Sequence, residues 1–315
     1  MRRLGDDEPE PESPMSSIRN ALASATALLL VTLPLRVSRS QDARLELTQF
    51  PLVAPASLTA GLPDSGRAQK TLFTRHDLIP IAGAAVATGV TAIFDKRIAA
   101  WFQSPHVQGS NSFNHDIGQL TRINETPLAI ASILTYGVGR VAHSQTTADV
   151  GLHWTQALLL TDVISEAIRG PVGRARPRVS MDDPFKFQFG AGFTKFENRS
   201  WPSLHAAVGF ATAASLLEEI QVRNPGAVKY AAVPLYAFAM VPGLTRMYLN
   251  QHWASDVVAG AFIGQFLGHR VVHYAHTHKR TKLDRALLAT SVMPGGYGNA
   301  IVSIDVQKLF STSGQ

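Results

Sequence analysis

Residues 202–220 read PSLHAAVGFATAASLLEEI, a short polar break followed by an apolar run that is rich in alanine and leucine. Ser203 can cap a helix, because a serine side chain accepts a hydrogen bond from the N–H groups of the first turn. The apolar run is long enough for a helix rather than a strand. The stretch therefore predicts a helix over residues 206–220, whose first turn can face an anion.

Five further apolar segments of similar composition flank this stretch on both sides. They run over residues 78–94, 127–142, 152–168, 228–244 and 254–272. Six such segments predict an all-α fold, a helical bundle of about six core helices. The tail differs, because residues 291–294 and 300–306 form two short runs on either side of a glycine-rich turn. This pattern predicts a small C-terminal β-hairpin.

The start of the chain has a composition of its own. Residues 5–14 are acidic and proline-rich, which predicts disorder because such a segment buries too little apolar surface to fold. Arg19, the apolar residues 21–35 and the small residues before Gln41 follow in the order of a secretory signal peptide, with cleavage after Ser40. An uncleaved membrane anchor is the alternative.

These compositional changes divide the chain into four parts. We expect a disordered start plus signal peptide over residues 1–40, an N-terminal arm over 41–75, a helical domain over 76–280 and a C-terminal tail over 281–315. The arm is assigned because its Pro, Gly, Ser and charged residues show no sustained periodicity.

Charge and cysteine content limit the classes of function. The 315 residues carry a formal net charge of +6, which suits an anionic partner such as a phosphate ester or an acidic lipid headgroup. No run of lysine and arginine with interleaved aromatic residues occurs, so we expect no nucleic-acid partner. Cysteine is absent, which excludes disulfides, thiol nucleophiles and cysteine metal sites.

Charged side chains interrupt several of the apolar segments. They are Asp162, Glu166, Glu218, Glu219 and Arg270. Each would cost about 2.5–3.5 kcal/mol at the centre of a bilayer. An exported arm and an external active site also conflict with six full spans. The sequence therefore favours an exported protein, periplasmic or membrane-associated with its active site outside the cytoplasm, and an integral membrane protein is the alternative.

Three polar breaks between the apolar segments concentrate residues that bind phosphate or transfer protons. They are RGPVGRARP at residues 169–177 with Arg169 and Arg176, PSLH at 202–205 with Ser203 and His205, and RMYLNQHWASD at 246–256 with Arg246, His252 and Asp256. Guanidinium groups hold phosphate oxygens through paired N–H donors. The three breaks therefore predict a phosphate-binding site.

The histidines give this site a chemistry. His252 and Asp256 are four residues apart, so a helical turn can place the carboxylate against one ring nitrogen and leave the other free to attack phosphorus. His205 is suited to protonate the leaving alcohol, because its intrinsic pKa is near neutral. Arginines rather than a metal would balance the phosphate charge. We therefore expect no cofactor and no metal ligand.

In order and in helix placement the three breaks resemble the signature motifs of the type 2 phosphatidic acid phosphatase and vanadium haloperoxidase superfamily: Lys-x6-Arg-Pro, Pro-Ser-Gly-His and Ser-Arg-x5-His-x3-Asp. The resemblance covers about residues 169–256. It implies an all-α core with His252 as nucleophile, His205 as acid and Asp256 as the group that orients His252. It also implies that Arg169, Arg176, Ser203 and Arg246 bind phosphate.

Three positions depart from these motifs. Arg169 replaces a lysine and keeps the charge, and Thr245 replaces a serine and keeps a hydroxyl. Leu204 replaces a glycine in the turn that holds the phosphate. Leucine does not readily adopt a positive φ, although its N–H stays available if the turn is helical.

The resemblance leaves three functions open. The first is an acid phosphatase or lipid phosphate phosphatase that hydrolyses a phosphomonoester or diphosphate through a phosphohistidine, with phosphatidate or a polyprenyl diphosphate as substrate and the membrane surface as partner. The second is a haloperoxidase that holds vanadate as its cofactor. The third is a non-catalytic relic that binds phosphate or lipid, which the replacement at Leu204 suggests.

Two further groups of residues are singled out. His269 and His273 have the four-residue spacing of a metal pair, but no carboxylate or cysteine accompanies them in the sequence, so a solvated helix end is the preferred interpretation. Five phenylalanines between residues 185 and 196 form either an apolar lid for a lipid chain or a cover for the bundle.

Overall fold

The computed structural model describes residues 72–109, 111–120, 123–281, 284, 290–294 and 300–304. All of them belong to one compact unit, Gln69–Gln315. The predicted disordered start and signal peptide lie outside the described residues, as does the predicted arm except for residues 72–75. Those assignments, with the predicted domain boundaries, therefore stay predictions.

All six predicted helices are present, and each is longer than the apolar run that predicted it. Their bounds are α2 Leu78–Phe102, α4 Glu125–Val141, α5 Gln145–Val172, α6 Leu204–Arg223, α7 Val228–Tyr248 and α8 Ala254–Thr277. The sequence did not predict α3, Asn111–Leu120, whose residues are mostly polar. Five short 3-10 helices connect these elements: η1 Arg75–Asp77, η2 Pro177–Val179, η3 Ala191–Phe193, η4 Phe196–Asn198 and η5 Pro225–Ala227.

The β-hairpin is also present. Strand β1, Thr290–Pro294, pairs antiparallel with β2, Ala300–Ile304, in a two-stranded sheet. All other regular structure in the described residues is helical. The prediction of an all-α bundle with a small terminal hairpin is confirmed.

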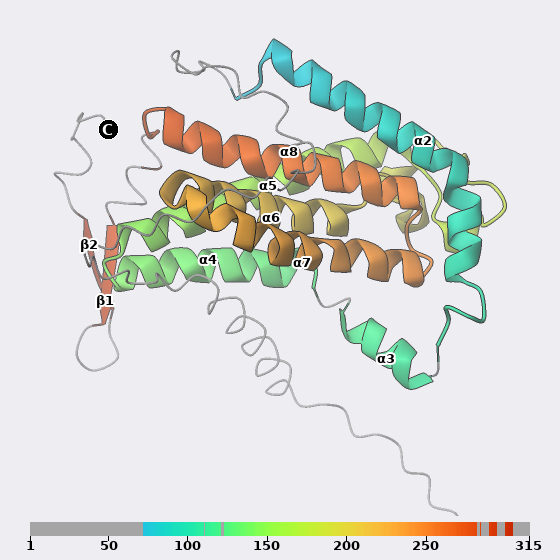
Figure 1. Ribbon diagram of the computed structural model, residues 1–315, viewed down its shortest axis with the longest axis horizontal. Coiled ribbons are helices and arrows are strands. Elements are labelled where there is room, and N and C mark those ends of the chain that lie inside the picture. Colours follow the sequence, from blue (N-terminus) through green and yellow to red (C-terminus); the bar gives the residue numbers. More distant parts are fainter. Residues whose placement is uncertain are drawn as a thin grey trace, which may run out of the picture. The chain divides into compact units, whose positions relative to one another are not determined.

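Helix α6 lies at the centre of the bundle. It contacts α5, α7 and α8, while α4 packs on α5 and α2 packs on α8. The first residues of α6 and α8 and the last residues of α5 and α7 lie at the same end, on the right of Figure 1. The connections at that end are the three polar breaks, so the fold brings them together.

Small residues let α6 and α8 approach each other closely. A Cβ atom at Gly264 of α8 would collide with the carbonyl oxygen of Ala207 on α6, and Gly260 and Gly268 make equivalent approaches one turn before and after. Such a stripe of glycines four residues apart allows two helix backbones to come into contact. At the start of this interface the N–H of Ser203 donates to the carbonyl oxygen of Asp256 over 2.9 Å.

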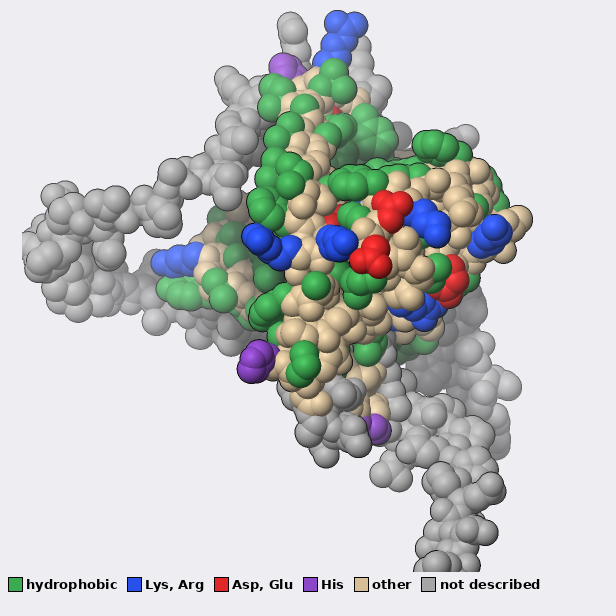
Figure 2. Space-filling model, turned by 90° about the vertical axis from the view of Figure 1, so that its right-hand side faces the viewer, with side chains coloured by type: hydrophobic (Ala, Val, Ile, Leu, Met, Phe, Trp, Pro, Cys, Tyr) green, Lys and Arg blue, Asp and Glu red, His purple; other side chains and the backbone are tan. Residues whose placement is uncertain are grey.

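Two described helices are long and apolar enough to cross a membrane. These segments are Arg75–Phe102 and Pro225–Tyr248, and only 6% and 22% of their most apolar windows are buried inside the structure. The core helix of a water-soluble bundle would be mostly buried, so these helices need another explanation. Figure 2 shows a run of hydrophobic side chains that reaches the top of one face, with Lys, Arg, Asp and Glu gathered beside it.

The exposed apolar side chains on α2 are large. They include Leu78, Ile79, Val86, Ile93 and Trp101, each more than half exposed. On α7, Tyr230 and Val233 are more than 70% exposed. A contiguous apolar surface of this kind is typical of a protein that contacts lipid or another protein. It favours the integral alternative over the peripheral one.

Candidate active site

The three polar breaks converge at one end of the bundle. Arg169 lies in the last turn of α5, and Arg176 directly precedes η2. His205 is the second residue of α6, Arg246 lies in the last turn of α7, and Asp256 lies in the first turn of α8. Residues separated by almost ninety positions in the sequence therefore face one another.

His252 is fully buried in the connection between α7 and α8. Its Nδ1 atom lies 3.6 Å from Oδ2 of Asp256, so the carboxylate faces this nitrogen as the spacing predicted. His252 itself precedes α8 rather than belonging to it. Its Nε2 atom has no hydrogen-bond partner among the described residues. The ring thus has one nitrogen beside a carboxylate and another with a free lone pair.

Asp256 is held by several donors. Its Oδ2 accepts hydrogen bonds from Ser200 Oγ at 2.5 Å and from the N–H of Trp253 at 2.8 Å, and its Oδ1 accepts one from Arg174 at 2.6 Å. Arg174 also donates to Asp95 of α2 at 2.8 Å. These contacts fix the carboxylate that faces His252.

Asp95 ties α2 to the same network. Its carboxylate accepts the N–H of Ser255 at 2.9 Å and the Ser255 hydroxyl at 2.5 Å. Asp95, Ser255 and Asp256 are all 0% exposed, and Arg174 is 2% exposed. Buried charges persist in folded proteins when they are paired and hydrogen-bonded, and this cluster meets both conditions.

Two of the predicted phosphate ligands are themselves held in place. Arg169 donates to Oε1 of Glu166 at 2.7 Å and to the carbonyl oxygen of Arg199 at 2.9 Å. Arg176 donates to the backbone and side-chain oxygens of Gln251 at 3.1 and 3.0 Å. Both guanidinium groups are buried, so their positions are set before any anion binds.

His205 lies beside His252, with 6.4 Å between the ring centroids. Its Nε2 atom is in contact with a guanidinium nitrogen of Arg246. Oε2 of Glu125, the first residue of α4, lies 3.7 Å from Nε2 of His205. The predicted acid therefore stands between an arginine and a carboxylate that the sequence analysis did not select.

The first turn of α6 forms another wall of the site. The Oγ atom of Ser203 accepts a hydrogen bond from the N–H of Ala206 at 3.5 Å, which confirms the predicted cap. Leu204 is the first helical residue and is not one of the described residues with a positive φ. Its replacement of glycine is compatible with the turn, because the turn is helical. The first turn of a helix generally leaves N–H groups that can bind an anion.

Burial and the arginines change the acidity of both histidines. The pKa of His252 is lowered to about 4, chiefly by burial and also by Arg176 and Arg169, while Asp256 opposes this lowering. The pKa of His205 is lowered to about 2, chiefly by burial and also by Arg246, His252, Arg169 and Arg176. Both rings are therefore neutral at pH 7 before an anion binds. A bound phosphate would raise both pKa values, because its negative charge favours the imidazolium form.

Sequence reasoning missed four buried contributors to the site. They are Asp95, Arg174, Ser200 and Ser255. Arg174 lies within the first polar break, and its position between Arg169 and Arg176 was the available signal. Asp95 lies in the apolar run of α2, almost eighty residues from Arg174, and only the fold connects the two.

Phenylalanines surround the first polar break. The ring of Phe196 lies over the guanidinium group of Arg176 at 4.4 Å, and the ring of Phe187 lies 5.5 Å from that of Arg174. Phe185, Phe189 and Phe193 are 59%, 86% and 69% exposed. The ring of Phe193 nevertheless lies against Gly170 of α5, as a cover for the bundle would. The lid and the cover therefore both stay predictions.

Comparison with known proteins gives a consistent result. The sequence model of the PAP2 superfamily matches residues 151–280, which contain all three polar breaks. A lipid A 1-phosphatase from Porphyromonas gingivalis is 30% identical over 113 residues, which are 33% of this chain and 24% of the relative. A lipid A 4'-phosphatase from Bacteroides thetaiotaomicron is 29% identical over 158 residues, which are 46% of this chain and 62% of the relative. The chain thus spans less than two thirds of the length of both relatives.

A solved structure is also similar. It is the crystal structure of the first transmembrane PAP2 type phosphatidylglycerolphosphate phosphatase from Bacillus subtilis, with a TM-score of 0.49 and 17% sequence identity. The match covers 64% of this chain and 98% of that one.

Proposed function

We propose that the chain is a member of the PAP2 superfamily and a metal-independent lipid phosphatase that works through a phosphohistidine on His252. The match of the family model to residues 151–280 and the two lipid A phosphatase relatives support this proposal. The observation that carries the proposal is the convergence of the buried His252 and the partly buried His205 with Arg169, Arg176 and Arg246 at one end of the bundle. A site with this many fixed cations suits a phosphate group, and its free imidazole nitrogen suits a nucleophile.

The first step is transfer of the phosphoryl group to the enzyme. Nε2 of His252 attacks phosphorus, an N–P bond forms, and the P–O bond to the alcohol breaks. Asp256 faces Nδ1 and stabilises the positive charge that develops on the ring. His205 donates a proton to the departing oxygen, so the alcohol leaves neutral.

The second step restores the enzyme. His205, now neutral, accepts a proton from a water molecule, whose oxygen attacks the phosphohistidine. The N–P bond breaks, inorganic phosphate leaves and His252 is again free. The three arginines hold the equatorial phosphate oxygens in both steps and neutralise their negative charge. In other phosphoryl-transfer sites, magnesium ions provide part of this neutralisation.

The proposed substrate class is a phosphate ester on a membrane lipid. Both curated relatives are named for lipid A, a phosphorylated glycolipid. The exposed apolar faces of α2 and α7 support contact with acyl chains, and the exposed Phe189 and Phe193 lie in the segment beside the phosphate site. A headgroup phosphate can then enter the site while its acyl chains stay in the bilayer.

The proposed location of the active site is outside the cytoplasm. The signal-like stretch over residues 15–40 supports export, and cleavage after Ser40 would leave a mature chain that begins at Gln41. N-terminal sequencing of the membrane-bound protein tests this part. An intact N-terminus would instead indicate a retained anchor.

One set of assays tests the enzyme proposal. The full-length chain in detergent micelles is supplied with a lipid A phosphate, phosphatidate and a polyprenyl diphosphate in the presence of EDTA, and phosphate release is measured. We expect release from at least one lipid, competitive inhibition by vanadate and a base-stable, acid-labile phosphoenzyme after a rapid quench. Bromide oxidation with vanadate and peroxide would identify a haloperoxidase instead. Phosphate binding without turnover would identify the non-catalytic relic.

A further inference from the structure

Two groups of histidine and glutamate side chains lie at the other end of the bundle from the phosphate site. One consists of Glu218, His269 and His273, and the other of His153, Glu219 and His276. In each group, one ligand atom from every residue lies within 4.8 Å of those of the other two. The adjacent residues Glu218 and Glu219 lie near the C-terminal end of α6, while the histidines of the two groups lie on α5 and α8.

The first group has the geometry of a metal site. His269 and His273 are one turn apart on α8, and their Nδ1 atoms lie 3.0 and 3.4 Å from the two carboxylate oxygens of Glu218. In a tetrahedral zinc site with bonds of about 2.0–2.1 Å, neighbouring ligand atoms are about 3.3 Å apart. The two measured separations lie on either side of that value, so small side-chain rotations would let all three ligands share one ion.

The electrostatic setting of Glu218 also favours a cation. Among the described residues, its ion-pair partners are His269 and His273 alone, both of which are neutral when they bind a metal. The Glu218 side chain is only 13% exposed, while His269 and His273 are 37% and 25% exposed. Among the described residues, a largely buried carboxylate with no arginine or lysine as ion-pair partner therefore lies next to two partly exposed imidazoles.

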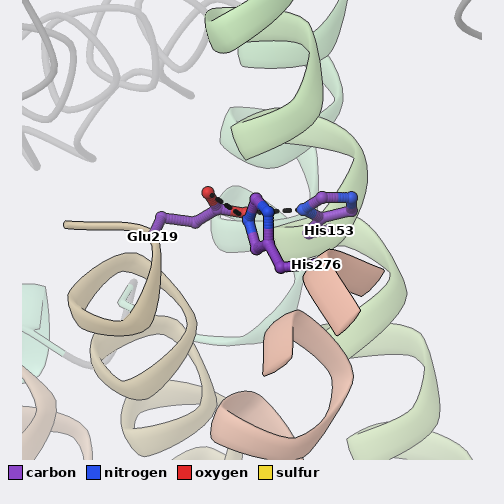
Figure 3. Close-up of side chains that lie close together, drawn as sticks. All are labelled: His153, Glu219 and His276. Carbon is purple, nitrogen blue, oxygen red and sulfur yellow. Dashed lines mark hydrogen bonds and ion pairs between the residues drawn. The ribbon is translucent and has the colours of Figure 1, made fainter. Parts of the chain in front are cut away.

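The second group is different, and it provides a comparison within the same fold. Figure 3 shows the Glu219 carboxylate reaching toward both His153 and His276, and its oxygens lie 2.5 Å from Nδ1 of His153 and 3.0 Å from Nε2 of His276. Arg223 forms an ion pair with Glu219 Oε2 one turn along α6. This carboxylate already has a cation, and the 2.5 Å contact leaves no room for an ion between its atoms. We interpret this group as a structural hydrogen-bond network.

We propose that Glu218, His269 and His273 bind a divalent transition-metal ion of the zinc class, with water as the remaining ligand. Two imidazoles and a carboxylate form a donor set that zinc accepts readily. The ion would join the end of α6 to α8. The inference is independent of the proposed phosphatase activity, because Asp256 and His269 are thirteen residues apart on α8, about 20 Å along the helix axis. The metal would therefore stabilise the helix pair and take no part in phosphoryl transfer.

The test measures binding of zinc ion to the full-length chain. The protein is purified in detergent without a histidine tag, stripped with a chelator and desalted, and then titrated by calorimetry and by equilibrium dialysis with metal analysis. We expect about one ion per chain and a higher thermal midpoint with zinc. Glu218→Gln and His273→Gln should each weaken binding by at least about tenfold. His276→Gln is the matched control, since it lies on the same helix in the second group, and it should bind zinc like the unmodified chain.

Several results would overturn the inference. One is an unmodified chain that binds no zinc above a buffer control. Another is loss of binding in His276→Gln together with retention in His273→Gln, which would assign the ion to the second group. If the variants fold poorly, cobalt ion is bound to the unmodified chain and its visible absorption spectrum is recorded. A spectrum that shows no nitrogen ligands on the cobalt would contradict the proposed site. Phosphatase activity in EDTA is recorded separately, so failure of the activity proposal and failure of the metal proposal remain distinguishable.

Discussion

At the scale of single residues, the site depends on how buried charges are arranged behind the reacting groups. Arg174 links two carboxylates, one on α2 and one on α8, and the second faces His252. Burial alone would raise the pKa of Asp256, but Arg174, His252 and Ser200 hold this pKa below its usual value. The carboxylate is therefore ionised throughout the range in which His252 is neutral, which is the state that attack on phosphorus requires.

The two histidines should have unequal effects on turnover. His252→Ala removes the nucleophile, and we expect turnover to fall by roughly 10⁴-fold or more. His205→Ala removes only the acid, for which a loss of about 10²–10⁴-fold is expected. Lipid phosphate release in detergent measures both, and the exposed His106→Ala is the control that should keep full activity. Ordinary turnover in His252→Ala would contradict the phosphohistidine mechanism.

The pH dependence of turnover should identify the role of His205. Its pKa is about 2 in the free protein, so it becomes an acid only when bound phosphate raises that value. A group that acts in its protonated form is lost as pH rises, so kcat should fall on the alkaline side. An activated ester such as p-nitrophenyl phosphate needs no proton on its leaving group. For that ester, the fall of kcat at alkaline pH and the loss of turnover in His205→Ala should both be small. Equal losses of turnover for the lipid and for the activated ester would contradict the role of His205 as the acid.

Arg174 should behave as a positioning residue. Arg174→Gln leaves two buried carboxylates without their cation, which should destabilise the fold by about 3–5 kcal/mol. In the protein that does fold, kcat should fall while KM changes little, because Arg174 orients Asp256 and is not assigned to the phosphate. The double variant Arg174→Gln with Asp95→Asn should regain part of the stability. Thermal unfolding and steady-state kinetics measure both effects, and a rise in KM alone would assign Arg174 to substrate binding instead.

At the scale of secondary-structure elements, the α6–α8 interface determines the distances within the site. His205 lies in the first turn of α6 and Asp256 in the first turn of α8, so the separation of these two helices sets the separation of the acid from the group that orients the nucleophile. The glycines at 260, 264 and 268 allow a backbone contact that larger residues would prevent. Because protein interiors are close-packed, even one added methyl group at this contact should destabilise the helix pair.

A pair of alanine substitutions tests that interface. Gly264→Ala places a Cβ against the backbone of Ala207, and we expect a loss of about 1–3 kcal/mol in stability together with lower turnover. Gly137→Ala on α4 is the matched control, because no atom lies within 4 Å of the added Cβ. Alanine is the better helix former, so this control should be neutral or more stable by up to about 1 kcal/mol. Thermal unfolding in detergent compares the two, and equal midpoints would show that the close contact is not needed.

At the scale of the whole molecule, the exposed apolar helices determine the environment in which the protein works. The most apolar window of Arg75–Phe102 is only 6% buried, so packing inside the protein does not account for its composition. Several of the charged residues that had suggested a peripheral protein have ion-pair partners within the bundle. Glu166, for example, binds Arg169 and Arg199, and Asp77 binds Arg270. Paired charges of this kind are compatible with a membrane environment.

Extraction experiments test the integral interpretation. We expect the chain to stay in the membrane pellet after carbonate treatment and to need detergent for release. Val86→Glu, on the exposed face of α2, should lower the membrane-bound amount, because a charge there would lie among acyl chains. Val179→Glu is the control, since Val179 is also exposed but lies in the short helix η2. Release of the unmodified chain by carbonate would support the peripheral alternative.

The sequence by itself determined the six long helices, their order and the residues of the three polar breaks. This was possible because helix formation and capping depend on neighbouring residues, as at Ser203, and because the spacing between His252 and Asp256 is local. Tertiary structure alone decided the contacts between distant segments. It joined Asp95 to Arg174, brought Glu125 to His205 and placed Glu218 beside a histidine pair that had no carboxylate in the sequence. Such contacts depend on how helix faces pack, and no local pattern encodes which faces will meet.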